Sequence, residues 1–272
     1  PHPIPKTNTY LPIDNWQLAL AAALILINII LSVSLKLGLA RRLGIAALRM
    51  VIQLLLVGYI LGWVFALDNP LWVLGLVLTM SAIAGNASVN RTRRRFPSIY
   101  WNSLVSILAA SAFVTSLLVE GIIHIDPWYD PQYVIPLLGM VLGNALTGTS
   151  LALDRLMEDL VSRRVQIESL LALGATRWEA ANETIKEALR TGMIPTINSM
   201  MVLGLVSLPG MMTGQMLAGV EPTSAVRYQI VIYFTIAAGT ALACIGIILL
   251  AFRQLFSPEH QLRLERLEKI ES

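Results

Sequence analysis

Seven runs of predominantly apolar residues, each close to the length of a membrane-spanning helix, constrain the fold of this chain more than any other feature. A helix needs about 20 such residues to cross the hydrocarbon core of a bilayer. The runs are 16–35, 46–67, 71–87, 103–123, 134–153, 194–217 and 228–252. The third run is short, and run 194–217 is interrupted by prolines and glycines. None alternates with the period of two that a spanning sheet requires, so each is predicted to be a helix.

The composition agrees with a chain that lies largely in lipid. Hydrophobic residues make up 56% of the 272 residues and charged residues only 14%, whereas soluble domains carry about 25% charged residues. A soluble fold of this length could not bury so much apolar surface. The one cysteine, Cys244, lies in an apolar run, which excludes an intrachain disulfide and a cysteine-based metal site. The polar residues before the first run show no pattern of a cleavable signal peptide.

Basic residues are concentrated in alternate connections between the runs. They follow the first, third, fifth and seventh runs: Lys36, Arg41, Arg42, Arg91, Arg93, Arg94, Arg95, Arg155, Arg163, Arg164, Arg177, Lys186, Arg190, Arg253, Arg263, Arg266 and Lys269. With seven spans these connections share one face, which the positive-inside rule places in the cytoplasm. The net charge of +3 therefore reflects membrane orientation, and we expect no nucleic-acid partner.

The expected fold is an all-α, polytopic membrane protein with about seven transmembrane helices. Its N-terminus is expected outside and its C-terminus in the cytoplasm. The chain then divides into an external arm (1–15), a transmembrane domain (16–253) and a cytoplasmic tail (254–272).

The charged segment 154–190, between the fifth and sixth runs, is predicted to be a cytoplasmic helix–turn–helix. Apolar residues recur at helical spacing from Leu153 to Leu171, and Gly174 is placed to end that helix in the left-handed conformation. The sequence TRWE that begins at Thr176 has the pattern of a capping box, which starts the next helix. Spacing alone favours an amphipathic hairpin that lies on the membrane or on neighbouring helices.

Sequence motifs add a more specific expectation. The stretch 168–174, with Glu168 six residues before Gly174, is similar to the EAA-type loop of ABC transporter permeases, although Ser169 and Leu170 replace its small pair. Longer motifs resemble one permease family, which comprises the bacterial Fet-type iron-export permeases and the plant aluminium-sensitivity and aluminium-tolerance permeases. They are LGAT at 173–176, IPT at 194–196, GLVSLPGMMTG at 204–214 and AGVEP at 218–222. The resemblance covers nearly the whole chain from the second run onward.

The resemblance implies the permease subunit of an ABC transporter, a homodimer in the cell (inner) membrane that is driven by a separate ATPase subunit. The chain has no G-x-x-x-x-G-K-[ST] phosphate loop, so ATP and Mg are expected on the partner, with no cofactor on this chain. The resemblance favours export of iron or another metal. Export of a nucleotide sugar or other organic solute is an alternative, and a non-transporting scaffold or sensor is another. No span carries paired carboxylates, a Ser–His pair or H-E-x-x-H, which speaks against an intramembrane enzyme.

Two groups of candidate site residues follow. The resemblance implies contact with the ATPase, or a place in the turn, for Glu168, Gly174, Thr176, Arg177 and Trp178. Polar and thioether side chains within the runs are candidates for a translocation path, since such residues in a membrane tend to be functional: Arg49, Gln53, Asn86, Asn144, Asn198, Ser207, Met211 and Met212. Each type of residue also has a structural interpretation. The arginine would anchor its helix at the membrane interface, the other polar groups would form interhelical hydrogen bonds, and the methionines would fill gaps in the packing. No metal site is assigned.

Small residues and proline mark special backbone positions. Pro209 and Gly210 are predicted to break the sixth span, because proline lacks the amide hydrogen and clashes with the preceding turn. Glycines four residues apart allow close helix contact, here or in a dimer: Gly58 and Gly62, Gly139 and Gly143, Gly210 and Gly214.

Overall fold

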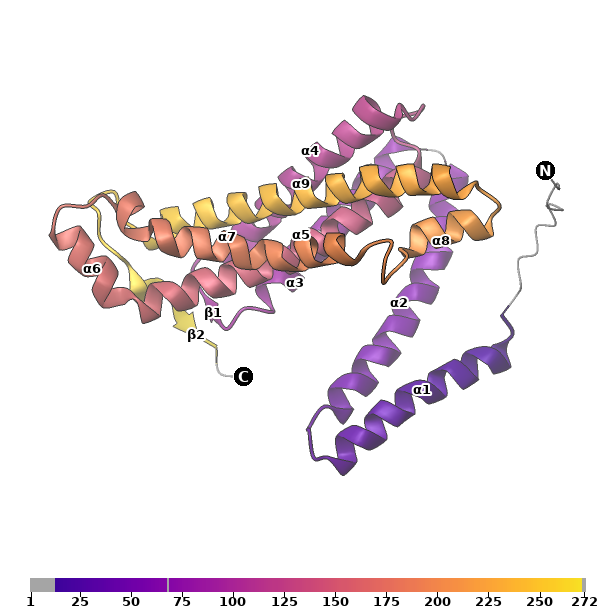
Figure 1. The fold of residues 1–272 in the computed structure, drawn as a ribbon, viewed down its shortest axis with the longest axis horizontal. Helices are drawn as coiled ribbons and strands as arrows, with labels where there is room; N and C mark the ends of the chain where they lie inside the picture. The colour runs from indigo at the N-terminus through magenta and orange to yellow at the C-terminus, as the bar shows by residue number, and fades with distance from the viewer. Residues whose placement is uncertain (1–12, 68, 271–272) are drawn as a thin grey trace. The chain divides into compact units, whose positions relative to one another are not determined.

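The computed structural model describes residues 13–67 and 69–270, and it is almost entirely helical (Figure 1). The arm expected at 1–15 falls outside the described residues except for its last three. The long helices are α1 (Asn15–Ser34), α2 (Ala40–Leu67), α3 (Pro70–Val89), α4 (Ile99–Ser116), α5 (Pro131–Ser162), α7 (Arg177–Val202) and α9 (Pro222–Leu255). The shorter elements are α6 (Arg164–Ala172), α8 (Gly210–Leu217), a π-helical extension of α4 (Leu117–Ile123), a 3-10 turn (Leu264–Arg266) and the strands β1 (Arg94–Arg95) and β2 (Glu268–Lys269).

Six helices in the described part of the chain are long and apolar enough to cross a membrane. They are α1, α2, α3, α4 with its extension, α5 and α9. Each of them contains one of the predicted runs. The run 194–217 is different, because it is not one helix: α7 ends at Val202 and α8 begins at Gly210. This run can therefore cross a membrane only as a broken helix.

The break has a local cause. Leu203 leaves the helix in an extended conformation, and Gly204 follows with a φ of 79°, in the left-handed region that favours glycine. The Gly204 amide donates to the Ser207 carbonyl at 3.0 Å, which closes a short turn. Pro209 then precedes α8, where its missing amide hydrogen costs nothing because no intrahelical partner exists there.

The chain divides into two compact parts. The first comprises residues 13–69, except 68, with 215–220, and its main feature is the hairpin of α1 and α2. Nearly all apolar side chains of both helices are exposed in the single chain, as expected for helices that contact lipid. The second part comprises residues 70–214 and 221–270 and contains the packed core.

Helices α5, α7 and α9 run side by side through the second part (Figure 1). Their closest approach is at Gly148 on α5 and Gly192 on α7. A Cβ built on Gly192 would lie 2.8 Å from the Gly148 carbonyl oxygen and 3.0 Å from the Cys244 sulfur of α9. Only glycines allow the two backbones to come this close.

The spaced glycine pairs noted in the sequence do not make such contacts within the chain. An added Cβ would meet nothing within 4 Å at Gly58, Gly62, Gly143, Gly210 and Gly214, and would make only an ordinary contact, at 3.4 Å, at Gly139.

The end of the second part that carries α6 has the largest hydrophobic core. The 32-residue helix α5 is about 48 Å long at 1.5 Å per residue, which exceeds a hydrocarbon core of about 30 Å. Its final turns bury Leu153, Met157 and Leu160 against α7 and α9, and Ile167 of α6 joins them. The predicted apolar stripe is thus confirmed, although α5 continues as one helix from the fifth run to Ser162.

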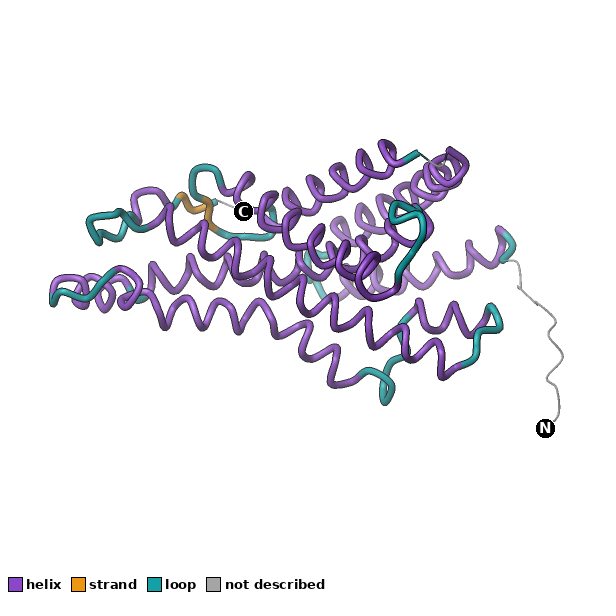
Figure 2. The backbone as a smooth tube through the Cα atoms, turned by 90° about the horizontal axis from the view of Figure 1, so that it is seen from above, coloured by secondary structure: helices purple, strands orange, loops and turns teal. Residues whose placement is uncertain are grey.

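The C-terminal segment 256–270 folds back onto this core. Phe256 is buried within it, and Leu262, Leu264 and Leu267 pack against it. Strand β2 pairs antiparallel with β1, so the region after α9 reaches the loop between α3 and α4. Figure 2 shows the two strands side by side near the C-terminus. Residues 256–270 of the segment expected as a tail therefore pack against this core.

Candidate functional site

The turn between α6 and α7 is fixed by Gly174. Its φ is 93°, and its amide donates to the Leu171 carbonyl at 3.1 Å. The Ala175 amide then donates to the Leu170 carbonyl at 3.0 Å. These bonds satisfy the last carbonyl groups of α6 and reverse the chain, which explains why glycine occupies the position.

A capping box then starts α7. The Thr176 hydroxyl accepts a hydrogen bond from the Glu179 amide at 3.3 Å, and a Glu179 carboxylate oxygen accepts from the Thr176 amide at 2.8 Å. The same oxygen accepts from the Thr176 hydroxyl at 2.7 Å. The hydrogen bond from the Thr176 amide, followed by that from its hydroxyl, holds the pKa of Glu179 below its usual range. The carboxylate is thus charged at neutral pH, where it also interacts favourably with the positive end of the helix dipole.

The first turn of α7 is fastened to the C-terminal segment. The Arg177 amide donates to Nδ1 of His260 at 3.0 Å, and its guanidinium donates to the Ser257 carbonyl at 3.2 Å. The same guanidinium lies 5.6 Å from the ring centroid of Phe252 at the end of α9. Trp178 packs edge-on against that ring at 5.5 Å. Movement of the turn would therefore be transmitted to α9.

Sequence reasoning missed Ser257 and His260, because they lie some 80 residues after their partner. The only available signal was the series of leucines at 262, 264 and 267, which is more apolar than a solvated tail.

The surface around the turn is exposed and partly apolar. The Leu173 side chain is 85% exposed and Trp178 is 46% exposed. Glu168 forms an ion pair with Arg164 at 2.8 Å on the exposed side of α6. The five predicted contact residues thus lie on α6, in the turn and at the start of α7, where Gly174, Thr176 and Trp178 are exposed and Glu168 and Arg177 are half-buried.

Within the second part of the chain, the predicted translocation residues are not gathered in one site. Asn86, Asn198 and Ser207 are exposed, and the Asn144 side chain donates to the Met140 carbonyl of its own helix at 2.9 Å. Arg49 and Gln53 lie on α2, in the first part of the chain, where both are exposed. Met211 is half-buried and packs against the core formed by α4, α5 and α9.

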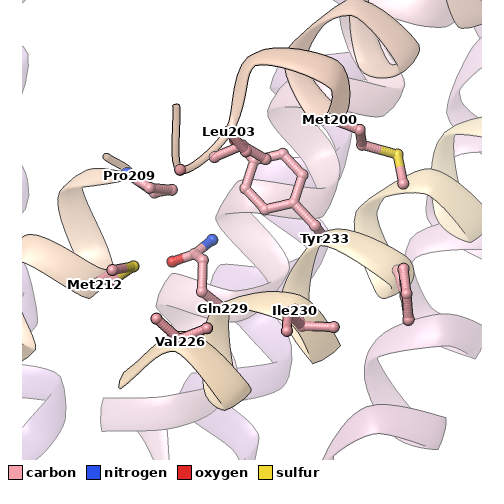
Figure 3. A pocket seen from close by; sticks show the side chains of 10 residues that line it. Met200, Leu203, Pro209, Met212, Val226, Gln229, Ile230 and Tyr233 are labelled. Carbon is pink, nitrogen blue, oxygen red and sulfur yellow. The ribbon is translucent and has the colours of Figure 1, made fainter. Parts of the chain in front are cut away.

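Met212 does line a pocket of about 440 Å³ in the second part of the chain. Its walls are the end of α7, the broken segment with the start of α8, and the early turns of α9 (Figure 3). The lining residues are Met200, Leu203, Gly204, Pro209, Met212, Val226, Gln229, Ile230, Tyr233 and Phe234. Sequence reasoning had selected only Pro209 and Met212 among them. A glutamine inside the run 228–252 was an available signal for the rest of this site.

Gln229 is the buried polar group of this pocket. Gln229 is 7% exposed, and its Oε1 has no hydrogen-bond partner among the described residues. Within the same residues, no group of three or more His, Cys, Asp or Glu side chains is placed to hold a metal ion.

Comparison with known proteins identifies relatives over almost the full length. The sequence profile of the uncharacterised protein family UPF0014 matches residues 15–256. The UPF0014 membrane protein YjkA of Bacillus subtilis is 39% identical over 253 residues, which cover 92% of this chain and 98% of the relative. The probable iron export permease protein FetB of Escherichia coli is 34% identical over 260 residues, covering 94% and 98%. Protein ALUMINUM SENSITIVE 3 of Arabidopsis thaliana is 32% identical over 245 residues, covering 90% and 88%.

No solved structure matches the chain. The relatives confirm the predicted resemblance to the iron-export and aluminium-sensitivity permeases. Together with the six apolar helices, they identify a multi-pass membrane protein.

Proposed function

The chain belongs to the UPF0014 family, and on this premise we propose that it is the permease subunit of an ABC transporter, driven by a separate ATPase subunit. In this proposal two copies of the chain form a homodimer in the cell (inner) membrane and export a solute from the cytoplasm. ATP and Mg are bound by the partner subunit. The observation that carries the proposal is the turn between α6 and α7, which is exposed at its tip and firmly attached to the core at its base.

Rigid attachment is what energy transfer through this turn requires. The buried core joins α5, α6, α7 and α9 at this end, and Arg177 and Trp178 both contact Phe252 of α9. A packed core of this kind moves as a unit and does not deform continuously. Closure of the ATPase against the turn would therefore move α7 and α9 together.

The basic residues support the orientation in this proposal. The connections after α1, α3, α5 and α9 carry most of the lysines and arginines, which favours a cytoplasmic location for the α6–α7 turn. The N-terminus then lies outside and the C-terminus in the cytoplasm. With six unbroken spans, this arrangement also requires that the end of α7, the following loop and α8 together make a seventh crossing.

The name of the Escherichia coli relative makes iron, or another metal, the first solute to test. A nucleotide sugar or other organic solute is the second candidate. Within this class, the pocket beside α9 favours an uncharged solute, because it has no charged side chain to bind a diphosphate.

The first experiment measures whether the turn binds an ATPase. The purified permease in detergent is immobilised, and a stand-alone ABC ATPase from the same genome is bound to it. Leu173→Ser is expected to weaken binding by about tenfold or more, because burial of a leucine side chain is worth about 1.5–3 kcal/mol. Leu205→Ser is the matched control, since Leu205 is 89% exposed and lies in the loop after α7. If the two variants bind the ATPase with equal affinity, the turn is not part of the contact.

The second experiment measures transport by the reconstituted pair in inverted vesicles. We expect the permease to stimulate ATP hydrolysis, and uptake of Fe²⁺ or of a nucleotide sugar to depend on ATP. Gly174→Pro is expected to abolish this dependence while leaving the permease folded. A permease that binds the ATPase but moves neither solute and leaves hydrolysis unchanged would be a scaffold, and the transport proposal would fail.

A further inference from the structure

The pocket beside α9 has the size and lining of a site for a small organic molecule. Its volume of about 440 Å³ lies in the range of about 300–1,000 Å³ that such sites occupy. None of the ten lining residues is charged, and only Gln229 and Tyr233 have polar side-chain groups. The pocket therefore suits a ligand that is mostly apolar and has one hydrogen-bonding group.

Gln229 supplies the specific feature of the site. It is 93% buried, yet its Oε1 has no partner among the described residues. An unsatisfied buried polar group of this kind costs about 1–3 kcal/mol and is rare in folded proteins. Figure 3 shows the carboxamide pointing into the space between α9 and the broken segment that contains Leu203 and Pro209.

One other buried hydroxyl group of α9, that of Thr240, also has no hydrogen-bond partner among the described residues, but Thr240 lies at the contact with Gly148 and does not line this pocket. The Thr235 hydroxyl, which is similarly buried, donates to the Val231 carbonyl of its own helix at 3.0 Å. A helix in a membrane usually satisfies its hydroxyl groups in this way. Among the residues that line the pocket, Gln229 is therefore the one with a buried, unpaired side-chain oxygen.

A bare metal ion does not fit this lining. Iron prefers imidazole and carboxylate ligands, and the pocket contains neither. The two thioethers, of Met200 and Met212, lie on opposite sides of the pocket in Figure 3 and do not converge. No lining residue supplies the negative charge that would offset the loss of the ion's hydration.

We propose that this pocket binds the transported solute, and that the solute enters it as a neutral, mainly apolar organic molecule that pairs with the Gln229 carboxamide. This inference rests on the proposed transport function and names its substrate class. The broken segment between α7 and α8 forms one wall of the pocket. Binding therefore contacts a stretch of backbone that lies outside the regular helices, where a change of shape is less costly.

The test uses 4-benzoylbenzamide as a probe, with the permease in complex with its ATPase. The probe is neutral, its two rings match the apolar walls, and its carboxamide is able to form two hydrogen bonds with that of Gln229. Illumination attaches it covalently to nearby C–H groups, and mass spectrometry of the digested protein locates the adducts. We expect adducts between residues 200 and 212 and between residues 226 and 234, and stimulation of ATP hydrolysis by the probe.

Three variants define the site. Gln229→Leu removes the hydrogen-bonding group and is expected to lower labelling about fivefold, while thermal stability stays equal or rises because the unpaired amide is gone. Val226→Trp is expected to abolish labelling by filling the pocket. Thr235→Val is the matched control, since it removes a similarly buried polar group of α9 outside the pocket, and its labelling is expected to be unchanged.

Other outcomes overturn the inference in distinguishable ways. Adducts elsewhere, or equal labelling of Gln229→Leu and the wild type, would show that the probe does not use this pocket. Labelling that occurs in detergent but disappears in lipid nanodiscs would identify a bilayer lipid as the occupant. Equal stimulation of wild type and Gln229→Leu by Fe²⁺ alone would show that iron bypasses the pocket, which leaves the transport proposal intact. Failure of the transport proposal itself would be detected separately, by the ATPase binding assay on Leu173→Ser and Leu205→Ser.

Discussion

Replacement of Gly148 by alanine tests the closest helix contact in the second part of the chain. The new Cβ would lie 2.6 Å from the Thr240 methyl carbon, 3.0 Å from the Gly192 carbonyl oxygen and 3.1 Å from the Cys244 sulfur. The carbonyl belongs to the backbone of α7, so it yields only if the helix moves. Overpacking of this kind costs about 1–3 kcal/mol. Alanine otherwise favours a helix over glycine by about 1 kcal/mol, so we expect a net loss of about 0–2 kcal/mol relative to the wild type.

The assay is reversible unfolding in mixed micelles, in which the fraction of SDS is raised and helix content is followed. Gly143→Ala is the control, because it lies on the same helix and its added Cβ meets nothing within 4 Å. The control is expected to be as stable as the wild type or slightly more stable. Addition of Thr240→Ser to Gly148→Ala removes the nearest atom and should restore part of the loss. If Gly148→Ala proves as stable as Gly143→Ala, the close packing of α5, α7 and α9 described above is wrong.

Further predictions concern the turn. Gly174→Ala places a side chain at a φ of 93°, which costs about 1–2 kcal/mol, and should reduce stimulation of the ATPase in the reconstituted pair. Thr176→Ala removes the cap, worth about 1 kcal/mol, and should speed hydrogen exchange in the first turn of α7. Because the folded-state pKa of Glu179 is lowered from 4.5, its stabilisation is present above that value and is lost as the pH falls through the lowered pKa. Protection of that turn from hydrogen exchange should fall with it. Thr176→Ala keeps the amide hydrogen bond to Glu179 and loses that of the hydroxyl group, so it should show a weaker dependence on pH. His260→Ala should speed exchange of the Arg177 amide alone, and unchanged exchange would contradict their hydrogen bond.

Patterns within short stretches of sequence predicted the spanning helices and the turn, because interactions between residues close in sequence determine these features. Six of the seven apolar runs each lie in a helix long enough to span, because apolar length alone decides whether a segment prefers lipid. Gly174 and Thr176 end and start their helices as their neighbours in sequence indicate, since both effects involve residues at most five positions away.

The contacts between distant residues could not be predicted in this way. The glycine pairs spaced four residues apart were predicted to allow close helix contact. The close contact instead involves Gly148 of α5 and Gly192 of α7. Met212 was a candidate for its chemistry, but Gln229 reaches the same pocket from another helix. No pattern within either helix indicates which faces meet, because that depends on how the whole bundle packs.

The position of His260 has a consequence for biosynthesis. The Arg177 amide finds its partner 83 residues later in the chain, and β2, which pairs with β1, also follows α9. The turn between α6 and α7 is therefore secured only after α9 has been inserted and the C-terminal segment has left the ribosome. A chain that stops before His260 lacks that anchor, so the surface proposed for the ATPase also depends on synthesis of the C-terminal segment.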